Sequence, residues 1–231
     1  MVIHGLQKTT LLDYPTKVAA TVFFGNCNFR CPFCHNMNLV LASDEEPVIP
    51  EEEFFSFLRS RRGILDGVCI TGGEPTLQKD LPDFIRAIRE LGFAVKLDTN
   101  GSNPGLLKSL VSDRLLDYVA MDIKSSKDQY SRVCNVPGLP TEPIGESVSF
   151  LLQEPVPYEF RTTIVREYHT AEVMEQIGEW IDGAKAYYLQ SFVSSEHVPD
   201  QTLHACSPEE LRHFQEILQP HMQNVSLRGV E

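Results

Sequence analysis

The chain has 231 residues, of which 42% are hydrophobic, and its formal net charge is -12 at pH 7. A chain of this length can bury a substantial core, and α/β barrels of this size commonly fold as one unit, so we expect a single domain over residues 1–231. The negative charge argues against nucleic acid as a partner, because nonspecific binding to phosphates depends on Lys and Arg. Residues 1–8 lack a signal-peptide pattern and the apolar run 18–24 is too short to cross a bilayer. We therefore expect a cytoplasmic protein with no membrane partner.

Apolar runs rich in β-branched residues predict six buried strands. They cover residues 18–24, 67–71, 94–99, 118–123, 158–165 and 186–192. Helical patterns lie between them: residues 81–91 repeat apolar side chains at helical spacing before Gly92, and residues 173–181 do so before Gly183. At the end of the chain, Ser207 and Glu210 form a capping-box pattern that opens a helix, and a short strand follows within 207–228.

Alternating strands and helices predict a parallel sheet with right-handed crossovers. An eight-unit barrel needs about 250 residues, so this chain is short for one. We expect an α/β fold, a partial (β/α)6 open barrel with its core over about residues 16–192. The alternative is an open doubly wound sheet, but cysteines replace the glycine-rich turn that such a fold carries after its first strand.

Three cysteines follow the first predicted strand, Cys27, Cys31 and Cys34 in a C-x-x-x-C-x-x-C pattern. Three thiolates would hold a [4Fe-4S] cluster and leave its fourth iron open to a substrate. The alternative is a zinc site that adds His35, although adjacent Cys34 and His35 cannot easily both face one tetrahedral ion. The remaining cysteines are isolated and are expected to be small core residues. They are Cys69, Cys134 and Cys206.

Polar residues recur where predicted strands end, which is where parallel α/β folds place their reactive groups. Gly72 and Gly73 would let a ligand approach the main chain, and Glu74 offers an anion to an ammonium group. Asp98 ends the third strand and Lys124 follows the fourth. Each could also be an ordinary turn or surface residue, but their occurrence at successive strand ends favours a site.

Arg161 interrupts an apolar strand and shares a face with Thr163 by the two-residue period. A buried arginine needs an anion. A ligand carboxylate or Asp98 could supply it, and an internal ion pair with Glu159 or Asp122 is the structural alternative.

For two further groups of polar residues, the sequence pattern does not distinguish a functional role from a structural one. Gln190 and Ser191 could bind a ligand or fill the barrel. His169 and His197 fall in predicted loops, and we expect both at the surface.

The C-x-x-x-C-x-aromatic-C motif, with Phe33 before Cys34, together with residues 72–75 one βα unit later, resembles the radical S-adenosylmethionine superfamily. More narrowly, residues 34–36, 97–101 and 121–124 look like glycyl-radical-enzyme activases. Residues 5–15 are similar to the activating proteins of anaerobic ribonucleoside-triphosphate reductases.

The resemblance implies a [4Fe-4S] cluster on the three cysteines and S-adenosylmethionine on its open iron. It implies that Glu74 and the main chain of Gly72 and Gly73 receive the methionyl ammonium, and that Phe33 lies near adenine. Three charged residues would contact the rest of this cofactor, the two cations near its carboxylate. They are Asp98, Lys124 and Arg161.

The same resemblance implies reductive cleavage of S-adenosylmethionine to a 5′-deoxyadenosyl radical. This radical would take the Cα hydrogen of a glycine in a partner, anaerobic ribonucleoside-triphosphate reductase, with electrons from a low-potential donor such as flavodoxin or ferredoxin. The alternatives are a small-molecule radical enzyme similar to carboxy-deazaguanine synthases, and an electron-transfer or zinc-binding module. Residues 190–192 replace a histidine that some activases carry on the sixth strand, and no insert with extra cysteines is present.

Overall fold

A computed structural model of the protein describes residues 1–41 and 47–230. Within these ranges one sheet of eight strands has the order β1-β2-β3-β4-β5-β6-β7-β8. Its first strand, β1 (Ile3–Thr10), is antiparallel to β2 (Ala19–Phe24), and every later pair is parallel. The other strands are β3 (Gly67–Gly72), β4 (Ala94–Thr99), β5 (Tyr118–Asp122), β6 (Tyr158–Ile164), β7 (Tyr187–Ser191) and β8 (Val225–Arg228).

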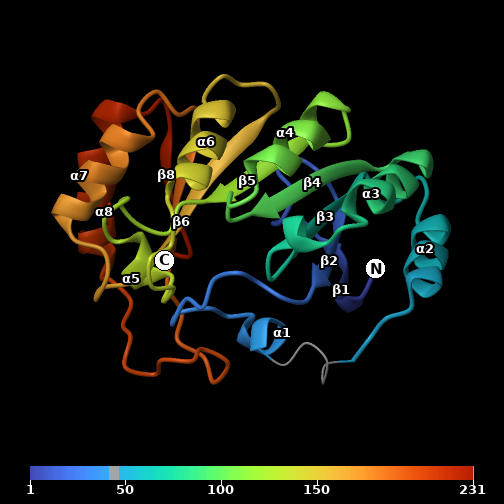
Figure 1. The fold of residues 1–231 in the computed structure, drawn as a ribbon, viewed down its shortest axis with the longest axis horizontal. Coiled ribbons are helices and arrows are strands. Elements are labelled where there is room, and N and C mark those ends of the chain that lie inside the picture. Colours follow the sequence, from blue (N-terminus) through green and yellow to red (C-terminus); the bar gives the residue numbers. More distant parts are fainter. Residues whose placement is uncertain (42–46, 231) are drawn as a thin grey trace.

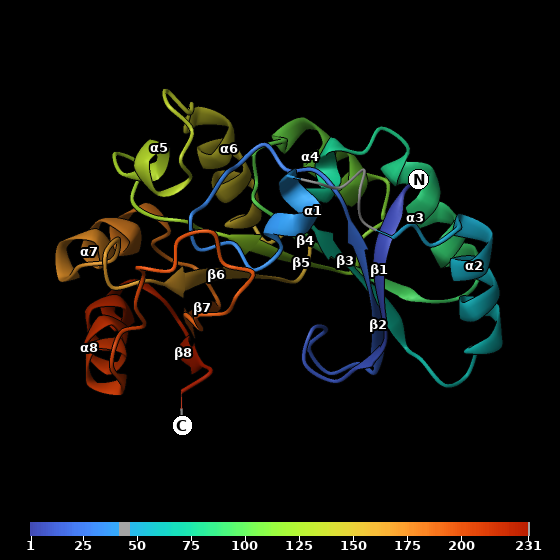
Figure 2. The same ribbon diagram turned by 90° about the horizontal axis from the view of Figure 1, so that it is seen from below.

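Most helices cover the convex side of the curved sheet, whereas α1 lies beside the strands at their carboxyl edge (Figures 1 and 2). The helices are α1 (Met37–Leu41), α2 (Glu51–Ser60), α3 (Leu81–Glu90), α4 (Pro104–Ser112), α5 (Tyr130–Val133), α6 (Glu142–Leu151), α7 (Ala171–Trp180) and α8 (Pro208–Leu218), with 3₁₀ turns η1 (Pro75–Leu77) and η2 (Gln219–His221). The strand order stops at β1 and β8, so in the described chain the sheet is an open, partial barrel as predicted. None of its helices is both long and apolar enough to span a membrane.

All six predicted strands are present, but the sheet extends beyond the predicted core of residues 16–192. The short C-terminal strand becomes β8 and pairs with β7. The prediction missed β1, which adds an antiparallel edge to β2. An edge strand has one side open to solvent and needs no apolar run, and the middle of β1 at Gln7–Thr9 is exposed. Hydrophobic periodicity could not reveal it.

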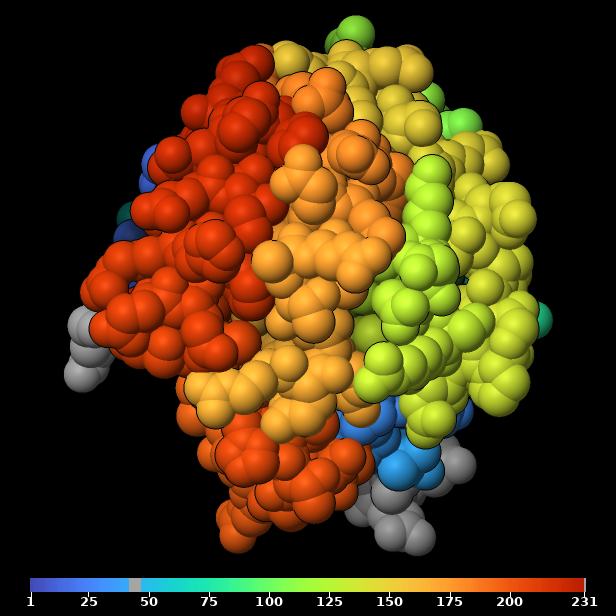
Figure 3. Space-filling model, turned by 90° about the vertical axis from the view of Figure 1, so that its left-hand side faces the viewer, coloured from blue at the N-terminus to red at the C-terminus, as the bar shows by residue number. Residues whose placement is uncertain are grey.

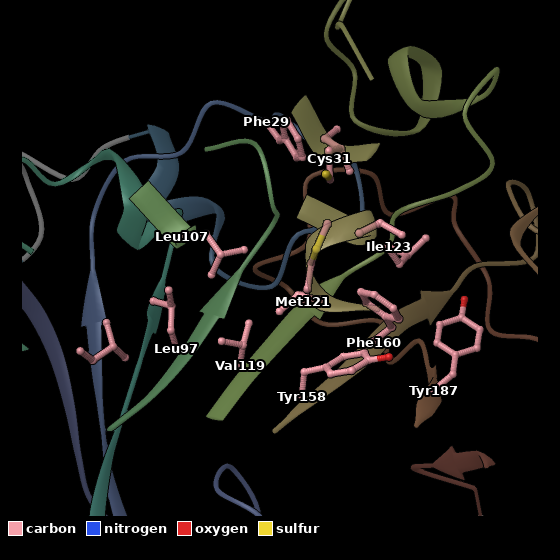
Figure 4. Packing of buried hydrophobic residues seen from close by; sticks show 14 of the residues in the cluster. Phe29, Cys31, Leu97, Leu107, Val119, Met121, Ile123, Tyr158, Phe160 and Tyr187 are labelled. Atoms are coloured by element: carbon pink, nitrogen blue, oxygen red, sulfur yellow. The ribbon is translucent and has the colours of Figure 1, made fainter. Parts of the chain in front are cut away.

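The two faces of the sheet differ in chemistry. The face toward the helices is apolar and carries buried side chains such as Leu97, Val119 and Phe160, with Leu107 of α4 packed nearby (Figure 4). The concave face carries charged residues at the alternate positions of the same strands, among them Lys96. Because successive strand residues point to opposite faces, the sequence of each strand encodes both a core and a polar lining.

The predicted helix boundaries near Gly92 and Ser207 are confirmed. Gly92 follows α3 with φ 91°, a left-handed conformation that glycine adopts at low cost. At the start of α8, the Glu210 N–H donates to Ser207 Oγ over 3.2 Å, and the Ser207 N–H donates to Glu210 Oε2 over 2.6 Å.

Replacing Ser207 with Ala removes the acceptor for one orphan N–H of α8. We expect the free energy of unfolding to fall by about 1 kcal/mol, measured by urea denaturation. Ser60→Ala, at an exposed serine in the last turn of α2, is the matched control and should change stability less. Equal losses in the two variants would contradict the capping role.

Candidate active site

A cavity of about 300 Å³ opens at the carboxyl ends of the parallel strands. Its wall combines the chain after β2 with strand ends from β3 to β7. Nine of the ten predicted site residues line it. They are Cys27, Cys31, Phe33, Cys34, Gly72, Gly73, Asp98, Lys124 and Arg161. The exception is Glu74, which does not line this cavity.

The cysteine loop, residues 25–36, presents the thiols of Cys27, Cys31 and Cys34 to this cavity, and all three are free. The Phe29 N–H donates to Cys27 Sγ over 3.3 Å, and the Cys34 N–H donates to the Cys31 carbonyl over 3.1 Å. Figure 4 shows Cys31 beyond the carboxyl end of β5, near Ile123.

The donor set of this loop fits an iron–sulfur cluster better than a zinc ion. In the described part of the chain, no three His, Cys, Asp or Glu side chains are arranged to hold a single metal ion. The three thiols line one cavity wall, and thiolates are the usual ligands of such a cluster. His35 Nε2 lies 2.7 Å from the Val193 carbonyl, and this contact with the main chain weighs against the predicted zinc alternative with His35.

Burial controls the protonation of these thiols. It raises the pKa of Cys27 to about 12 and also raises the pKa of Cys34. A metal-bound thiol is deprotonated because the metal supplies the compensating positive charge. Without a bound metal these two thiols are therefore protonated at neutral pH and are poor nucleophiles.

Gly72 and Gly73 are required by the packing of β3 against the chain that enters the cysteine loop. A Cβ atom at Gly72, where φ is 125°, would collide with the main chain of Phe24, and one at Gly73 would collide with Asn26. The Gly73 N–H donates to the Phe24 carbonyl over 2.9 Å, and the Glu74 N–H donates to the Asn26 carbonyl over 2.8 Å. The glycines thus bring two main chains into direct contact at the cavity.

The Glu74 carboxylate is only 1% exposed and is occupied by protein donors. It accepts hydrogen bonds from the Asn100 N–H (2.7 Å), the Thr99 hydroxyl (2.8 Å), and the N–H and hydroxyl of Thr76 (3.1 and 2.5 Å). Burial nevertheless raises its pKa. In this geometry Glu74 ties the end of β3 to the end of β4, and the expected ammonium contact stays a prediction.

Asn100 links the same strand end to the cysteine loop, a role that the sequence analysis missed. Its side-chain amide donates to Asn28 Oδ1 over 2.9 Å and lies 3.9 Å from Cys27 Sγ. The position of Asn100 in the polar segment at the end of β4 could have suggested a role in the site. Its partner Asn28 lies 72 residues away in sequence, so the contact itself could not be predicted.

Five charged side chains form a row of ion pairs on the concave face, here named the charge row. In order they are Lys96, Asp98, Arg161, Asp122 and Lys124. Lys96 pairs with Asp98, Arg161 bridges Asp98 (3.1 Å) and Asp122 (3.0 Å), and Lys124 Nζ lies 3.0 Å from Asp122 Oδ2. With three cations and two anions, the row carries a formal charge of +1.

The charge row settles which anions pair with Arg161. They are Asp98 and Asp122, so the guanidinium does not depend on a ligand for its charge balance. Glu159, the other predicted partner, is buried and instead accepts two hydrogen bonds from Arg228 of β8. Lys96, 1% exposed, was not predicted, although it lies two residues before Asp98 and therefore on the same face.

Burial opposes ionisation of the two aspartates, but their cationic partners outweigh it. Arg161 and Lys96 lower the pKa of Asp98, and Arg161 and Lys124 lower the pKa of Asp122 to about 2. Both carboxylates are therefore ionised at neutral pH. Removing Asp98 would leave Lys96, which is 1% exposed, as an uncompensated buried charge, and such a loss typically costs about 3–5 kcal/mol.

The prediction for His169 was wrong, because this side chain is 2% exposed. It lies after β6 and hydrogen-bonds the main chain at Val165 and Lys124. A short loop gave no sign of this, because its burial comes from neighbours distant in sequence. His197 is exposed as expected. Gln190 lines the cavity, which is compatible with both of its predicted roles, binding a ligand and filling the barrel.

The isolated cysteines are buried, as predicted. Cys134 follows α5 and lies against the cysteine loop, where its carbonyl accepts the Arg30 N–H over 2.9 Å. A hydrogen bond from Cys134 lowers the pKa of the Cys31 thiol. Cys69 packs beside Asp98 on the concave face, with 3.6 Å between Sγ and Oδ1.

An open parallel barrel with three cysteine thiols and a charged lining at its carboxyl edge defines a class of iron–sulfur enzyme. The family model described as the Radical SAM superfamily matches residues 21–182. The chain therefore belongs to the radical S-adenosylmethionine superfamily, whose cofactors are a [4Fe-4S] cluster and S-adenosylmethionine, and it is a radical S-adenosylmethionine enzyme. The predicted non-enzymatic module is overturned by this match.

Individual relatives include activating enzymes and a small-molecule enzyme. The chain is 31% identical to a Methanocaldococcus jannaschii protein named "Putative glycyl-radical enzyme activating enzyme", over 99% of this chain and 96% of that one. It is 31% identical to the pyruvate formate-lyase-activating enzyme of Clostridium pasteurianum over 54% of this chain and 53% of that one. It is also 31% identical to the 7-carboxy-7-deazaguanine synthase of Thermococcus kodakarensis over 45% and 47%. The chain thus spans about half the length of the last two.

Solved structures support the fold. A domain of the pyruvate-formate lyase-activating enzyme from Bacteroides vulgatus aligns with a TM-score of 0.58 at 18% identity, covering 71% of this chain and 99% of that one.

Replacing Glu74 with Ala leaves four buried donor contacts without their acceptor. We expect the free energy of unfolding to fall by about 3 kcal/mol or more, and iron content after anaerobic reconstitution to fall with it. Glu90→Ala, at an exposed position on α3, is the control. Loss of S-adenosylmethionine binding with full iron content and full stability would instead support the ammonium contact expected from sequence.

The lowered pKa of Asp122 predicts how the stability of the protein depends on acid pH. This pKa is lowered from about 3.9 in the unfolded chain to about 2 in the fold, so the contribution of Asp122 is complete above about pH 5 and is lost progressively as the pH falls toward 2. Asp122→Asn should therefore have a shallower fall in unfolding free energy between pH 5 and pH 3 than the wild type, in urea titrations of the metal-free protein. Asp83→Asn, at an exposed ion pair, should keep the wild-type slope. Equal slopes for Asp122→Asn and wild type would contradict the charge row.

Proposed function

We propose that this enzyme generates a glycyl radical on a partner enzyme, and that the partner is an anaerobic ribonucleoside-triphosphate reductase. The main support is the similarity to the named activating enzyme of Methanocaldococcus jannaschii, which extends over 99% of the chain. The motif in residues 97–101 supports an activating enzyme, and the motif in residues 5–15 supports the choice of reductase. A low-potential flavodoxin or ferredoxin would supply the electron.

Cys27, Cys31 and Cys34 would hold the cluster. When bound, the cluster and S-adenosylmethionine together supply a low-potential electron and a 5′-deoxyadenosyl radical. Overall, S-adenosylmethionine, one electron and a glycine Cα–H would give methionine, 5′-deoxyadenosine and the glycyl radical. The work of the protein is to orient the cofactor and to exclude water.

Lys124 and the backbone of the two glycines would orient the methionyl group. Lys124 Nζ carries three N–H donors, and Asp122 is its hydrogen-bond acceptor among the described residues. Remaining donors can therefore reach a carboxylate in the cavity. The carbonyls of Gly72 and Gly73 are the candidate acceptors for the ammonium, and Glu74 would support them from behind.

The remaining contacts follow from the cavity wall. Asp98 and Arg161 are neighbours in the charge row, and both line the cavity. Asp98 would face the ribose and Arg161 the carboxylate. Phe33, 4% exposed and 6.0 Å from the Tyr168 ring centroid, would present an apolar surface to adenine.

The open side of the sheet supports a protein substrate. The edges at β1 and β8 do not pair with one another in the described chain, and Figure 2 shows them at opposite ends of the curve. An incomplete barrel gives a partner loop a lateral route to the concave face. A closed barrel would admit ligands only at its ends.

The test is anaerobic incubation of the reconstituted enzyme with reductant, S-adenosylmethionine and the anaerobic ribonucleoside-triphosphate reductase of the same organism. We expect a glycyl-radical signal by electron paramagnetic resonance and about one 5′-deoxyadenosine per radical. Cys27→Ala, Cys31→Ala and Cys34→Ala should each lose the iron spectrum and the signal, whereas Cys206→Ala, at a buried cysteine that does not line the cavity, should keep both. Cofactor cleavage without a glycyl radical would contradict the proposed partner.

The similarity to a 7-carboxy-7-deazaguanine synthase supports a second candidate, a small-molecule radical enzyme. That function would produce 5′-deoxyadenosine in the presence of a metabolite and without any protein partner. The same incubation, with purine-like metabolites in place of the reductase, separates the two.

A further inference from the structure

The main chain of Lys124 is held from both sides by buried side chains that no sequence motif singled out. The Lys124 N–H donates to the hydroxyl of Tyr130 over 3.0 Å, and the Lys124 carbonyl lies 3.0 Å from Nε2 of His169. Tyr130 is fully buried and His169 is 2% exposed. One residue just beyond β5 thus has both main-chain polar groups paired with side chains from two different segments.

The hydrogen bonds of His169 define its tautomer. The Val165 N–H, which can only donate, lies 2.9 Å from Nδ1, so Nδ1 is the acceptor. Nε2 therefore carries the hydrogen and donates to the Lys124 carbonyl. Nδ1 also lies 3.0 Å from the Val165 carbonyl, but a hydrogen on Nδ1 would face the Val165 N–H.

Tyr130 connects this arrangement to the cysteine loop. Its ring lies edge-on to Phe29, with 6.4 Å between centroids, and edge-on to Trp180 of α7 at 5.8 Å. Figure 3 shows this side of the molecule, where the chain around α5 (yellow-green) lies beside α7 (orange). The cysteine loop, the end of β5 and α7 therefore meet at one cluster of aromatic side chains.

We propose that Tyr130 and His169 are positioning residues that clamp the main chain of Lys124 and so aim its ammonium at the carboxylate of S-adenosylmethionine. The inference rests on the proposed contact between Lys124 and that carboxylate. A lysine has a flexible four-carbon stem, and holding it in one geometry costs side-chain entropy. With the main chain clamped and Nζ paired to Asp122, both ends of the stem are fixed before the cofactor arrives.

The test measures the dissociation constant of S-adenosylmethionine by equilibrium dialysis with the reconstituted, iron-loaded enzyme. Tyr130→Phe removes one hydroxyl, and His169→Leu removes both ring nitrogens. Each should raise the dissociation constant about threefold to tenfold at unchanged iron content. His169→Gln, which keeps an N–H donor, should lie closer to wild type. Tyr187→Phe is the control, because it removes a buried hydroxyl whose partner is Thr162, and it should bind like wild type.

A second probe separates positioning from general damage. 5′-Methylthioadenosine lacks the methionyl carboxylate, so its affinity, measured by competition, should be the same in wild type and in both clamp variants. In a Lys124→Met background, Tyr130→Phe should have no further effect on S-adenosylmethionine affinity. A parallel loss of affinity for 5′-methylthioadenosine, or an additive effect in that background, would overturn the clamp.

The outcomes also distinguish this inference from the proposed function. If Lys124→Met leaves S-adenosylmethionine affinity unchanged, the proposed carboxylate contact fails and the clamp fails with it. If Lys124→Met weakens binding but Tyr130→Phe and His169→Leu do not, the contact stands and the clamp alone is refuted.

Discussion

Charge balance on the concave face is the constraint on which the site depends. A sheet whose outer face is covered by apolar packing could not keep five charged side chains in its interior unless each one had an opposite charge beside it. The charge row achieves this with alternating signs along β4, β6 and β5, ending at Lys124. Its excess positive charge faces the cavity, where the carboxylate of the proposed cofactor contact would be the compensating anion.

The same constraint explains why the row does not serve mainly as a source of stability. Buried ion pairs seldom stabilise a fold more than well-packed apolar residues would. Their value here is geometric, because each member restricts the next. Asp122 orients both Arg161 and Lys124, and Lys96 holds Asp98 from a position that ligands cannot reach.

The cysteine loop is positioned by contacts that are equally specific. The absence of side chains at Gly72 and Gly73 allows β3 to touch the chain entering the loop, and Glu74 collects donors from the end of β4. Asn100 of the same strand end hydrogen-bonds Asn28 of the loop, and Tyr130 of α5 packs against Phe29. A short segment with little secondary structure thus acquires a defined shape from contacts with β3, the end of β4 and α5.

The sequence by itself determined the open parallel barrel and nine residues of the cavity wall, the three cysteines among them. These follow from local patterns, because strand periodicity, cysteine spacing and the position of polar residues after strands are all properties of short segments. Tertiary structure decided the contacts between residues that are distant in sequence, which local patterns do not specify. It paired Arg161 with two aspartates, turned Glu74 away from the cavity, buried His169 against Lys124 and added β1 as an edge. Each of these outcomes depends on groups brought together from distant parts of the chain, and neither burial nor the choice among several possible partners is encoded in the spacing of neighbouring residues.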